Sequence, residues 1–318
     1  MTLVSANAES IARGAQLLQA GGLVAFPTET VYGLGALAFD PQAVARIFEL
    51  KGRPRFDPLI VHVLDRAMLE GVAAAFPPEA ERLAARFWPG PLTLVLPKAP
   101  AVPEIVTAGL ATVAVRMPSH PVARALLAAA RAPLAAPSAN RFGSLSPTRA
   151  EHVERDFGAR LLILNEGPSE HGIESTVVAL EPRPALLRPG AIPVEEIEAV
   201  IGPLAREEAA AVRAPGQLPR HYAPRTPLRV IEPATVAVAQ RAGAGALSLR
   251  EEFAGYAVSR VLSRRGDLRE AAAGFFETLH ALDALGLERI DAQPFPAHGL
   301  GLAMMDRLTR ASHRAVSS

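Results

Sequence analysis

The sequence lacks several features that would by themselves assign it to a class of protein. It has no cysteine, which excludes disulfide bonds, thiolate metal sites and cysteine nucleophiles. Its 33 basic and 32 acidic residues give a formal net charge of +1, so no bulk polycation is present to bind nucleic acid non-specifically. Aromatic residues make up only 5% of the chain, which offers few platforms for base stacking. No apolar run reaches the ~18 residues that span a bilayer, and the first ten residues do not form a secretory signal. We therefore expect a cytoplasmic protein without a membrane segment.

The common catalytic signatures are also missing. The chain has no Walker G-x-x-x-x-G-K-[ST], no H-E-x-x-H, no G-x-S-x-G and no spaced set of histidines and aspartates for a metal. Residues Gly33 to Ala38 satisfy the loose dinucleotide pattern G-x-G-x-x-A. That pattern requires its glycines to open a helix directly, whereas here the helix signal Asp40-Pro41 comes several residues later. We therefore reject a dinucleotide site at this position.

What is present is a globular composition. Hydrophobic residues make up 49% of the 318 residues and charged residues 20%. A chain of this length predicts about two domains of roughly 150 residues, each able to bury its own core.

The stretch Pro27-Thr28-Glu29-Thr30-Val31-Tyr32-Gly33-Leu34-Gly35 organises the first part of the chain. It follows the apolar run Leu23–Phe26, which predicts a buried strand, and it precedes the helix start at Asp40-Pro41. Hydroxyls, a carboxylate and glycines at a strand end are suited to a binding site. A plain turn has the same composition, so this stretch alone leaves both interpretations open.

The rest of the first 200 residues alternates between predicted strands and helices. Apolar periodicity and turn residues predict strands at Leu59–Val63, Leu92–Leu96, Thr112–Met117, Leu134–Ala136, Leu161–Leu164, from about Val177, and at Ala185–Arg188. Helices are predicted at Glu9–Ala20, Pro41–Leu50, Glu79–Trp88, Pro121–Ala130, from about Thr148, and at Val194–Val200.

A basic loop follows the second of these helices, in the segment Lys51-Gly52-Arg53-Pro54-Arg55-Phe56-Asp57-Pro58. Cations this close repel one another unless an anion or carboxylates offset their charge. The loop is either an ordinary solvated one or a clamp for a polyanion, with lysine as a point charge and arginine as a planar fork for phosphate oxygens.

Single cations also end two of the apolar strands. Arg116 breaks the run 112–117 near its end, and Arg188 does the same at the end of 185–188. Such an arginine is either paired within the fold or reaches a ligand carboxylate, and the sequence by itself favours pairing for Arg116. The loop from Pro137 to Thr148 adds hydroxyls, an amide and an arginine, although most capped loops of this kind have no further role.

The last third of the chain changes character. Residues 207–226 are rich in alanine and charge and end in Arg220-His221-Tyr222-Ala223-Pro224-Arg225, which we interpret as a linker with a specific second half. A small open α/β sheet is expected beyond it, with no visible catalytic cluster. Its elements are predicted as strands at Leu228–Ile231, Ala246–Leu249, Ala257–Leu262 and Arg289–Ala292, with helices at Thr235–Arg241, Leu268–Leu285 and Leu302–Ala311.

Taken together, cations and hydroxyls recur at the ends of several predicted strands. This distribution suits an anionic ligand held from many sides of a concave sheet, which means a phosphate-bearing or carboxylate substrate. The residues concerned are Thr28, Lys51, Arg53, Arg116, Ser138, Asn140, Ser175 and Arg188.

A resemblance to a known family narrows this interpretation. In order, the motifs PTETVYGLG, KGRP, WPGPLT, VRMP, PSAN, SPT, ESTVV and RPG resemble those of the YrdC-type L-threonylcarbamoyladenylate synthases. The K-x-R and S-x-N elements form that family's signature, and the likeness covers roughly residues 10–200. The His221-Tyr222-Ala223-Pro224 segment and the α/β tail resemble the long form, which has an extra C-terminal domain. Asp57 stands where the family commonly has asparagine, and Ala214-Pro215-Gly216-Gln217 where Ser-Pro-Gly-Met is usual.

The resemblance implies a fold and an activity. It implies a twisted mixed-sheet YrdC-like domain with a concave ligand site at residues 1–205, a linker crossing the active site at 206–227, and a smaller Rossmann-like α/β domain at 228–318. The implied enzyme is a nucleotidyltransferase that converts L-threonine, bicarbonate or CO2 and ATP into threonylcarbamoyl-AMP and pyrophosphate. This reaction is the first step of threonylcarbamoyl-adenosine formation in tRNA.

The resemblance also implies roles for individual residues. Catalytic residues would be Lys51, Arg53, Ser138 and Asn140; L-threonine would be bound by Thr28, His62, Arg116, Ala136 and Ser175; and ATP by Lys51, Arg55, Thr112, Ser138, Ser146, Arg188 and Tyr222. Mg²⁺ would enter with ATP through the phosphates, with no protein metal site and no organic cofactor.

The implied partners are the tRNA threonylcarbamoyl-transfer machinery, which would receive the product, and possible weak contact with tRNA or double-stranded RNA. Two other functions stay open. An RNA-binding module fits a concave basic sheet but not the low aromatic content or the balanced charge. A carbamoyl-transfer domain for hydrogenase maturation would come with acylphosphatase-like and zinc-finger segments, which this chain lacks.

Overall fold

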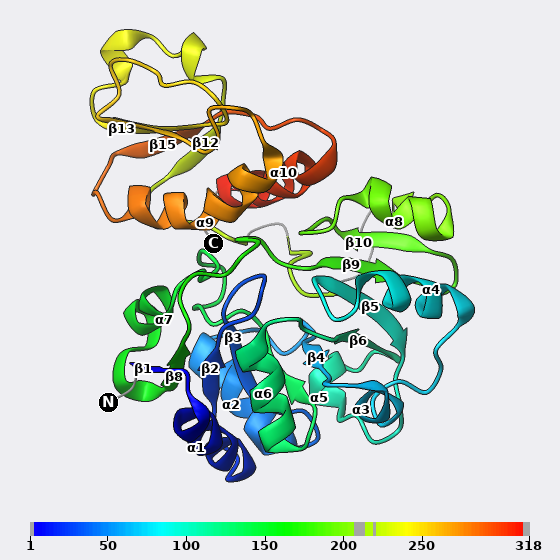
Figure 1. Cartoon of the computed structure of the whole chain (residues 1–318). Coiled ribbons are helices and arrows are strands. Elements are labelled where there is room, and N and C mark those ends of the chain that lie inside the picture. Colours follow the sequence, from blue (N-terminus) through cyan, green and yellow to red (C-terminus); the bar gives the residue numbers. More distant parts are fainter. Residues whose placement is uncertain (1–2, 207–213, 219–220, 314–318) are drawn as a thin grey trace.

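The computed structural model describes residues 3–206, 214–218 and 221–313, which form two β-sheets with helices packed on them (Figure 1). The larger sheet has 11 strands in the order β1-β8-β2-β3-β7-β4-β6-β5-β9-β10-β11 and mixes parallel with antiparallel pairs. Its strands are β1 (Leu3–Ser5), β2 (Val24–Phe26), β3 (Gly33–Leu37), β4 (Ile60–His62), β5 (Leu92–Pro97), β6 (Thr112–Arg116), β7 (Leu134–Ala135), β8 (Leu162–Asn165), β9 (Thr176–Ala179), β10 (Ala185–Arg188) and β11 (Ala205–Arg206).

Helices connect and cover these strands. They are α1 (Ala8–Gln19), α2 (Pro41–Lys51), α3 (Arg66–Glu70), α4 (Pro78–Phe87), α5 (Glu104–Thr107), α6 (Pro121–Ala130), α7 (Ala150–Phe157) and α8 (Val194–Ile201), with a 3₁₀ turn at Gly158–Arg160. Helix α2 illustrates how the local sequence sets the bounds. The Asp40 carboxylate accepts from the backbone N–H groups of Gln42 and Ala43, and Gly52 ends the helix in the left-handed conformation at φ 64°. Lys51 therefore stands in the last turn of α2, at its carboxyl end.

The smaller sheet is entirely parallel and belongs to the last part of the chain. Its order is β12-β15-β13-β14, from β12 (Leu228–Val230), β13 (Ala244–Ser248), β14 (Val258–Val261) and β15 (Arg289–Ala292). Helices α9 (Leu268–Asp283) and α10 (Gly299–Ser312) lie on the side of this sheet that faces the larger one (Figure 1). The predicted α/β class, a mixed sheet followed by a smaller open sheet, is confirmed.

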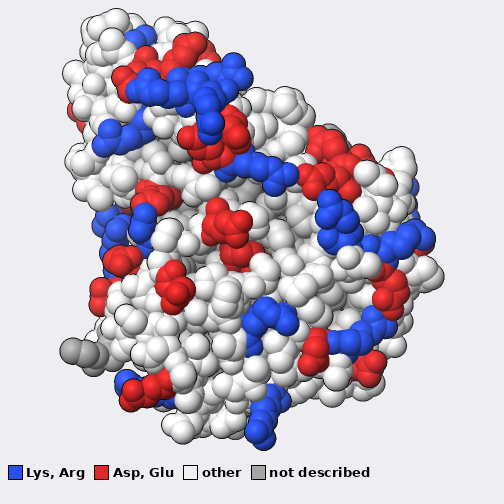
Figure 2. Space-filling model, viewed as in Figure 1, with Lys and Arg blue, Asp and Glu red and all other residues white. Residues whose placement is uncertain are grey.

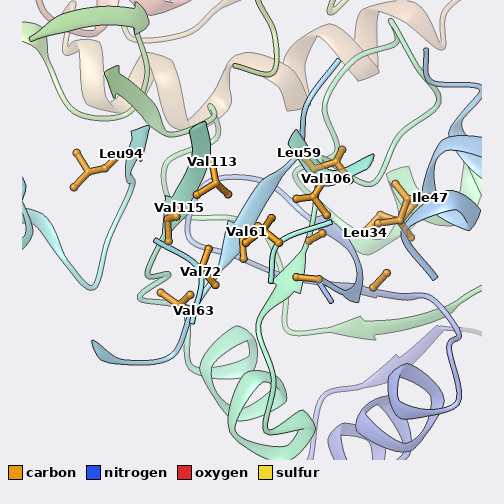
Figure 3. Packing of buried hydrophobic residues seen from close by; sticks show 14 of the residues in the cluster. Leu34, Ile47, Leu59, Val61, Val63, Val72, Leu94, Val106, Val113 and Val115 are labelled. Carbon is orange, nitrogen blue, oxygen red and sulfur yellow. The ribbon is translucent and has the colours of Figure 1, made fainter. Parts of the chain in front are cut away.

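The main core lies between the central strands of the large sheet and the helices beside them. Leu34 of β3, Val61 of β4 and Val115 of β6 are fully buried and belong to one cluster, together with Ile47 of α2 (Figure 3). A second cluster joins the two parts of the chain, because Val31 and Ile173 from the first part pack with Phe275 and Phe276 of α9. Among the described helices, none combines the length and the apolar character that crossing a bilayer requires.

One predicted loop is a strand. The sequence interpretation left residues 27–35 as a site loop, whereas Gly33–Leu37 forms β3, antiparallel to β2. Its glycines are explained by close packing, since a Cβ on Gly35 would lie 2.8 Å from the Phe26 ring. Glycine allows this strand to lie close to an aromatic ring. The glycines also leave the segment without the β-branched residues by which a strand is predicted from sequence.

The helix predicted at Thr235–Arg241 is also wrong. Two 3₁₀ turns, Pro233–Thr235 and Val238–Gln240, take its place. The Arg241 guanidinium donates to the carbonyls of Val236 at 2.8 Å and Ala234 at 3.1 Å, so a side chain satisfies carbonyls that a helix would pair internally. The short elements β1, α3, α5 and β11 were not predicted, because each is too brief to show a period.

The predicted linker, residues 206–227, lies partly outside the described residues, as does Arg220 in its second half. Of this segment the structure describes residue 206, residues 214–218 and the stretch from His221 onward. The bounds of the three predicted segments stay predictions.

Candidate functional site

A small, partly open cavity of about 50 Å³ lies between the large sheet and the described part of the linker. Its wall comes from strand ends and loops far apart in the sequence. The lining residues are Thr28, Thr30, Val31, Tyr32, Gly33, Arg53, Ile60, His62, Arg116, Ala136, Pro137, Ser138, Glu174, Ser175, Arg188, Pro215, Gly216, His221 and Tyr222.

Arg116 and His62 reach the cavity together because they are register partners at the ends of the parallel strands β6 and β4. Arg116 forms an ion pair with Glu29, at 2.7 Å between Nη2 and Oε1, and donates to the Thr30 hydroxyl at 2.8 Å. Burial raises the pKa of Glu29, but the charge and hydrogen bond of Arg116 outweigh it and hold that pKa at about 2. Arg116 is thus paired within the fold, as the sequence favoured, and still lines the cavity.

His62 is neutral in this setting. Burial first, and then the neighbouring Arg116 charge, lower its pKa to about 3. Its Nδ1 has no hydrogen-bond partner among the described residues, although the side chain is buried. The ring therefore lines the cavity and carries one buried polar atom that has no partner among the described residues.

Lys51 holds the Ser138 loop from behind. Its Nζ donates to the Ser138 carbonyl at 2.7 Å and to the Asn140 carbonyl, while the Ser138 hydroxyl donates to Asn140 Oδ1 at 2.5 Å. Complete burial and the nearby Arg53 lower the pKa of Lys51 well below its usual value. The K-x-R and S-x-N segments are therefore one connected unit, although more than 80 residues separate them in the sequence.

Arg53 and Arg188 differ in how their charge is balanced. Arg53 forms a buried ion pair with Asp57, at 2.9 Å between Nη2 and Oδ2, and donates to the Pro58 carbonyl at 2.9 Å. Arg188 donates only to neutral oxygens: the Ser175 carbonyl at 2.9 Å, the Ser175 hydroxyl at 3.1 Å and the Pro215 carbonyl at 3.0 Å. Within the described part of the chain, neither Arg188 nor Lys51 pairs with a carboxylate.

The far wall combines Glu174 with the linker. Glu174 accepts a hydrogen bond from the Ser146 hydroxyl and forms an ion pair with Arg307 of α10, at 3.0 Å between Oε2 and Nε. Tyr222 is buried and holds a left-handed backbone conformation at φ 61°, which is rare for a residue other than glycine. Gly216 packs so closely that a Cβ there would lie 2.2 Å from the Tyr222 hydroxyl oxygen. Both linker residues, Gly216 and Tyr222, therefore pack closely in this wall.

The structure brings most of the predicted site residues together. Those that line the cavity are Thr28, Arg53, His62, Arg116, Ala136, Ser138, Ser175, Arg188 and Tyr222. Lys51, Asn140 and Ser146 lie directly behind it, bonded to lining residues or their loops. Arg55 is exposed in its loop and Thr112 begins β6, at the opposite end of that strand from Arg116, and neither lines the cavity. Their assignment to ATP stays a prediction.

Sequence reasoning did not select the carboxylates of this site or the groups from the C-terminal part. Glu29 and Glu174 stood inside quoted motifs, and Asp57 had been noted only as a departure. The signal that could have found them is the excess of buried cations, since a buried arginine needs a counter-ion. Arg307 and His280 carried no local signal, because the site residues that they contact, Glu174 and Ser146, are more than 130 residues away.

No group of three or more histidine and acidic side chains suited to holding a metal ion occurs among the described residues. The nearby carboxylates Glu29, Asp57 and Glu174 each already face an arginine. The cavity offers positive charge, hydroxyls and two histidines, His62 and His221, whose pKa burial lowers, which suits a ligand with phosphate and carboxylate groups.

Comparisons with known proteins agree with this chemistry. Residues 16–190 match the Sua5, YciO and YrdC family, described as "Telomere recombination", and residues 192–313 match the family described as "Threonylcarbamoyl-AMP synthase, C-terminal domain". Curated relatives named threonylcarbamoyl-AMP synthase include one from Pyrococcus abyssi, 45% identical over 94% of this chain and 92% of the relative. Another from Bacillus subtilis is 44% identical over 97% of this chain and 94% of the relative.

Solved structures give the same result. The crystal structure of P. abyssi Sua5 complexed with L-threonine is 43% identical, has a TM-score of 0.90, and is matched over 98% of this chain and 96% of that one. E. coli YciO, at 23% identity and a TM-score of 0.51 over 59% of this chain, shares the fold of the first part.

Proposed function

The chain belongs to the threonylcarbamoyl-AMP synthase family, and on that premise we propose how its cavity joins L-threonine, bicarbonate or CO2, and ATP. The enzyme uses ATP to make the adenylate and so performs nucleotidyltransfer for tRNA modification. The observation that carries the residue assignment is that two buried cations at this site, Lys51 and Arg188, have no carboxylate partner among the described residues. Arg188 lines the cavity and Lys51 lies directly behind it, bonded to the Ser138 loop, and a polyphosphate would supply the missing negative charge.

L-Threonine occupies the side of the cavity near Arg116. The guanidinium takes the amino-acid carboxylate as a bidentate pair, in competition with Glu29, which is already 2.7 Å away. His62 presents its unused Nδ1. Thr28, Ala136 and Ser175 complete this side, and their small or hydroxyl side chains fit a compact polar amino acid.

ATP occupies the other side. Lys51 and Arg53 meet the phosphates, and Ser138, Asn140, Ser146 and Arg188 position the nucleotide, with Tyr222 closing over it. Arg55 and Thr112 complete the predicted set, although in this structure they do not line the cavity. Arg55 lies in an exposed loop beside Arg53, so it reaches a bound nucleotide only if the loop closes on it.

The chemistry consists of two steps. The threonine amine adds to CO2 to give a carbamate and a proton. A carbamate oxygen then attacks the α-phosphorus in line, forming the P–O bond of the mixed anhydride while the bond to the leaving pyrophosphate breaks. Negative charge spreads over the phosphoryl oxygens, so positioning and fixed cations supply most of the rate enhancement. No general base is needed once the carbamate has formed.

Mg²⁺ enters with the nucleotide. An Mg²⁺ ion that enters with ATP would be held mainly by phosphate oxygens and water, the usual arrangement for Mg²⁺ bound to ATP. There it neutralises phosphate charge, and the protein's own cations add to that effect.

The linker acts as a lid. Small-molecule sites commonly measure ~300–1,000 Å³, whereas the partly open cavity here holds about 50 Å³. The described linker residues Pro215, Gly216, His221 and Tyr222 form part of its wall. They must move outward to admit ATP, and they exclude water from the labile anhydride when they return.

The product passes to a partner that transfers the threonylcarbamoyl group to tRNA, because a mixed anhydride hydrolyses if it is released for long. Direct RNA binding has little support on the face in Figure 2, where basic and acidic side chains are interspersed rather than gathered into one patch.

The proposed reaction is tested by product analysis with ¹³C-labelled bicarbonate. The protein is incubated with ATP, Mg²⁺, L-threonine and the label, and the adenylate is identified by mass. We expect threonylcarbamoyl-AMP that carries one labelled carbon. An adenylate without the label, such as threonyl-AMP, would contradict the carbamate route.

A further inference from the structure

Arg307 is the unusual residue of the C-terminal part. It lies in α10, is only 1% exposed and is the largest of the fully buried side chains. A guanidinium is always charged, so burying it is costly unless its donors are used. It donates to Glu174 Oε2 at 3.0 Å, to the Pro189 carbonyl at 2.8 Å and to Asp306 at 2.7 Å.

Two of these partners belong to the catalytic part of the chain. Glu174 lines the cavity and accepts from the Ser146 hydroxyl with its other oxygen, so Arg307 fixes Glu174 and, through it, Ser146. Pro189 directly follows Arg188, the lining cation without a carboxylate partner among the described residues. One guanidinium from the second sheet's domain therefore holds two loops of the cavity wall.

Arg307 also contacts the linker. Its guanidinium carbon lies 5.0 Å from the centroid of the Tyr222 ring, a cation–π distance. Tyr222 is itself in a left-handed backbone conformation, which persists only where surrounding contacts impose it. Arg307 does not line the cavity, so each of these effects passes through another residue.

Charge explains why such a residue is needed. Glu174 is a buried carboxylate in the wall of a site that must accept a polyphosphate. Burial raises its pKa, but Arg307 and Arg188 outweigh burial and lower it, so the group is ionised. Without a counter-ion, that carboxylate would repel the incoming nucleotide and would draw Arg188 away from it.

We propose that Arg307 is a positioning residue for the nucleotide side of the cavity, by which the C-terminal domain neutralises Glu174 and holds Ser146, the Arg188 loop and Tyr222 in place. The identity of the nucleotide as ATP rests on the proposed function. The role itself does not depend on turnover, because it is expressed in nucleotide binding.

The experiment compares Arg307→Met, Arg307→Lys, Glu174→Gln and the double variant Arg307→Met/Glu174→Gln. Arg269→Met is the matched control, because Arg269 also pairs with an acidic residue of the first part, Glu196, but on the surface, where Arg269 is 69% exposed. Equilibrium affinities for ATP and for L-threonine are measured separately, followed by KM and kcat.

We expect Arg307→Met to weaken ATP binding by about 30-fold or more, because it leaves a buried carboxylate without its counter-ion, and to change threonine affinity by less than about twofold. Arg307→Lys should recover part of the loss, since it restores the charge without the planar fork. The double variant should bind ATP about tenfold more tightly than Arg307→Met. Arg269→Met should bind both ATP and threonine as the wild type does.

A purely structural role predicts other results. ATP affinity unchanged in Arg307→Met, equal losses for ATP and threonine, or a double variant no better than the single one would each overturn the proposal. If Arg307→Met does not fold, the double variant decides, because it does not leave a buried carboxylate at position 174 without its counter-ion. It should then bind threonine normally and ATP more weakly than wild type. Wild-type protein that binds ATP but makes no threonylcarbamoyl-AMP would reject the proposed function and leave this test intact.

Discussion

At the scale of single residues, the site is defined by which buried cations have a carboxylate partner. Arg53 and Arg116 are each paired, with Asp57 and Glu29, whereas Lys51 and Arg188 donate only to neutral oxygens among the described residues. Buried ion pairs contribute little net stability, yet breaking one is expensive because the remaining charge has no partner. A substitution at a paired cation therefore affects stability and binding together, and the two effects have to be separated.

The Arg116–Glu29 pair allows that separation. Arg116→Met should lower the free energy of unfolding by about 3–5 kcal/mol, since it leaves Glu29 ionised and buried. The double variant Arg116→Met/Glu29→Gln should regain most of that loss, because neither charge remains. Threonine affinity should stay low in both variants, measured by equilibrium binding beside chemical denaturation.

If the double variant regained threonine affinity along with stability, Arg116 would be a purely structural partner of Glu29. The assignment of its guanidinium to the amino-acid carboxylate would then be wrong.

At the scale of elements, the sequence predicted those parts of the fold whose signals are local. Helix α2 was placed nearly to the residue because Asp40, Pro41 and Gly52 mark its ends. Strand β3 was missed because Gly33 and Gly35 are set by the Phe26 ring, which sequence periodicity cannot show. The helix expected at Thr235–Arg241 failed because the Arg241 side chain takes the carbonyls that a helix would pair.

The candidate site likewise contains residues that the sequence reveals and residues that only the fold brings together. Cations and hydroxyls at strand ends, such as Arg116 and Ser138, could be selected from the sequence because the strands themselves were visible. Their counter-ions could not, since Glu174 meets Arg307 only through packing of the second sheet's helices on the first part of the chain. Pairing between distant elements is a property of the fold, and a single sequence gives no sign of it.

The linker gives a prediction with a close control. Gly216 and Gly202 both have φ of 85°, but a Cβ on Gly216 would lie 2.2 Å from the Tyr222 hydroxyl oxygen, whereas none of the atoms considered comes within 4 Å of one on Gly202. Both alanine variants should lose about 1 kcal/mol of stability from backbone strain. Only Gly216→Ala should weaken ATP binding, by about tenfold, because it displaces the lid. Equal ATP affinities for the two variants would contradict the lid assignment.

The contact between α7 and α9 predicts a pH dependence. His152 and His280 stack with ring centroids 3.7 Å apart, and His280 Nε2 lies 3.0 Å from the Ser146 carbonyl. Burial first, and then the second histidine, lower the pKa of His152 to about 3, and burial lowers that of His280 to about 4. Arg155, Arg149, Asp156 and Asp283 are the charged groups nearby.

Both histidines are neutral in the folded protein. Their contribution to the free energy of unfolding is therefore complete above pH 6.5, and it falls below pH 6.5 as the histidines of the unfolded chain take up protons. Each should cost about 1 kcal/mol of stability between pH 6.5 and 5.5. His280→Gln should show a shallower decline over that interval, measured by denaturation at several pH values. Parallel curves for the variant and the wild type would show that His280 does not titrate in this range.

At the scale of the whole molecule, the second sheet's domain is part of the site rather than an appendage. Its α9 packs Phe275 and Phe276 against Val31 and Ile173, which belong to site loops. Gly172 is so close to α9 that a Cβ there would lie 2.2 Å from the Ala273 carbonyl oxygen. The cavity wall is thus shaped from both sides, by the large sheet and by the helices that lie between the two sheets (Figure 1).

The central claim is that this cavity uses its buried cations to activate ATP for a carbamate made from threonine. The most direct test measures pyrophosphate release with ATP, Mg²⁺ and bicarbonate, with and without L-threonine, for the wild type and for Lys51→Met. We predict release that requires threonine and falls by roughly 100-fold or more in the variant, since one stabilising donor is lost. Release that is independent of threonine, or a Lys51→Met variant as active as the wild type, would contradict the account.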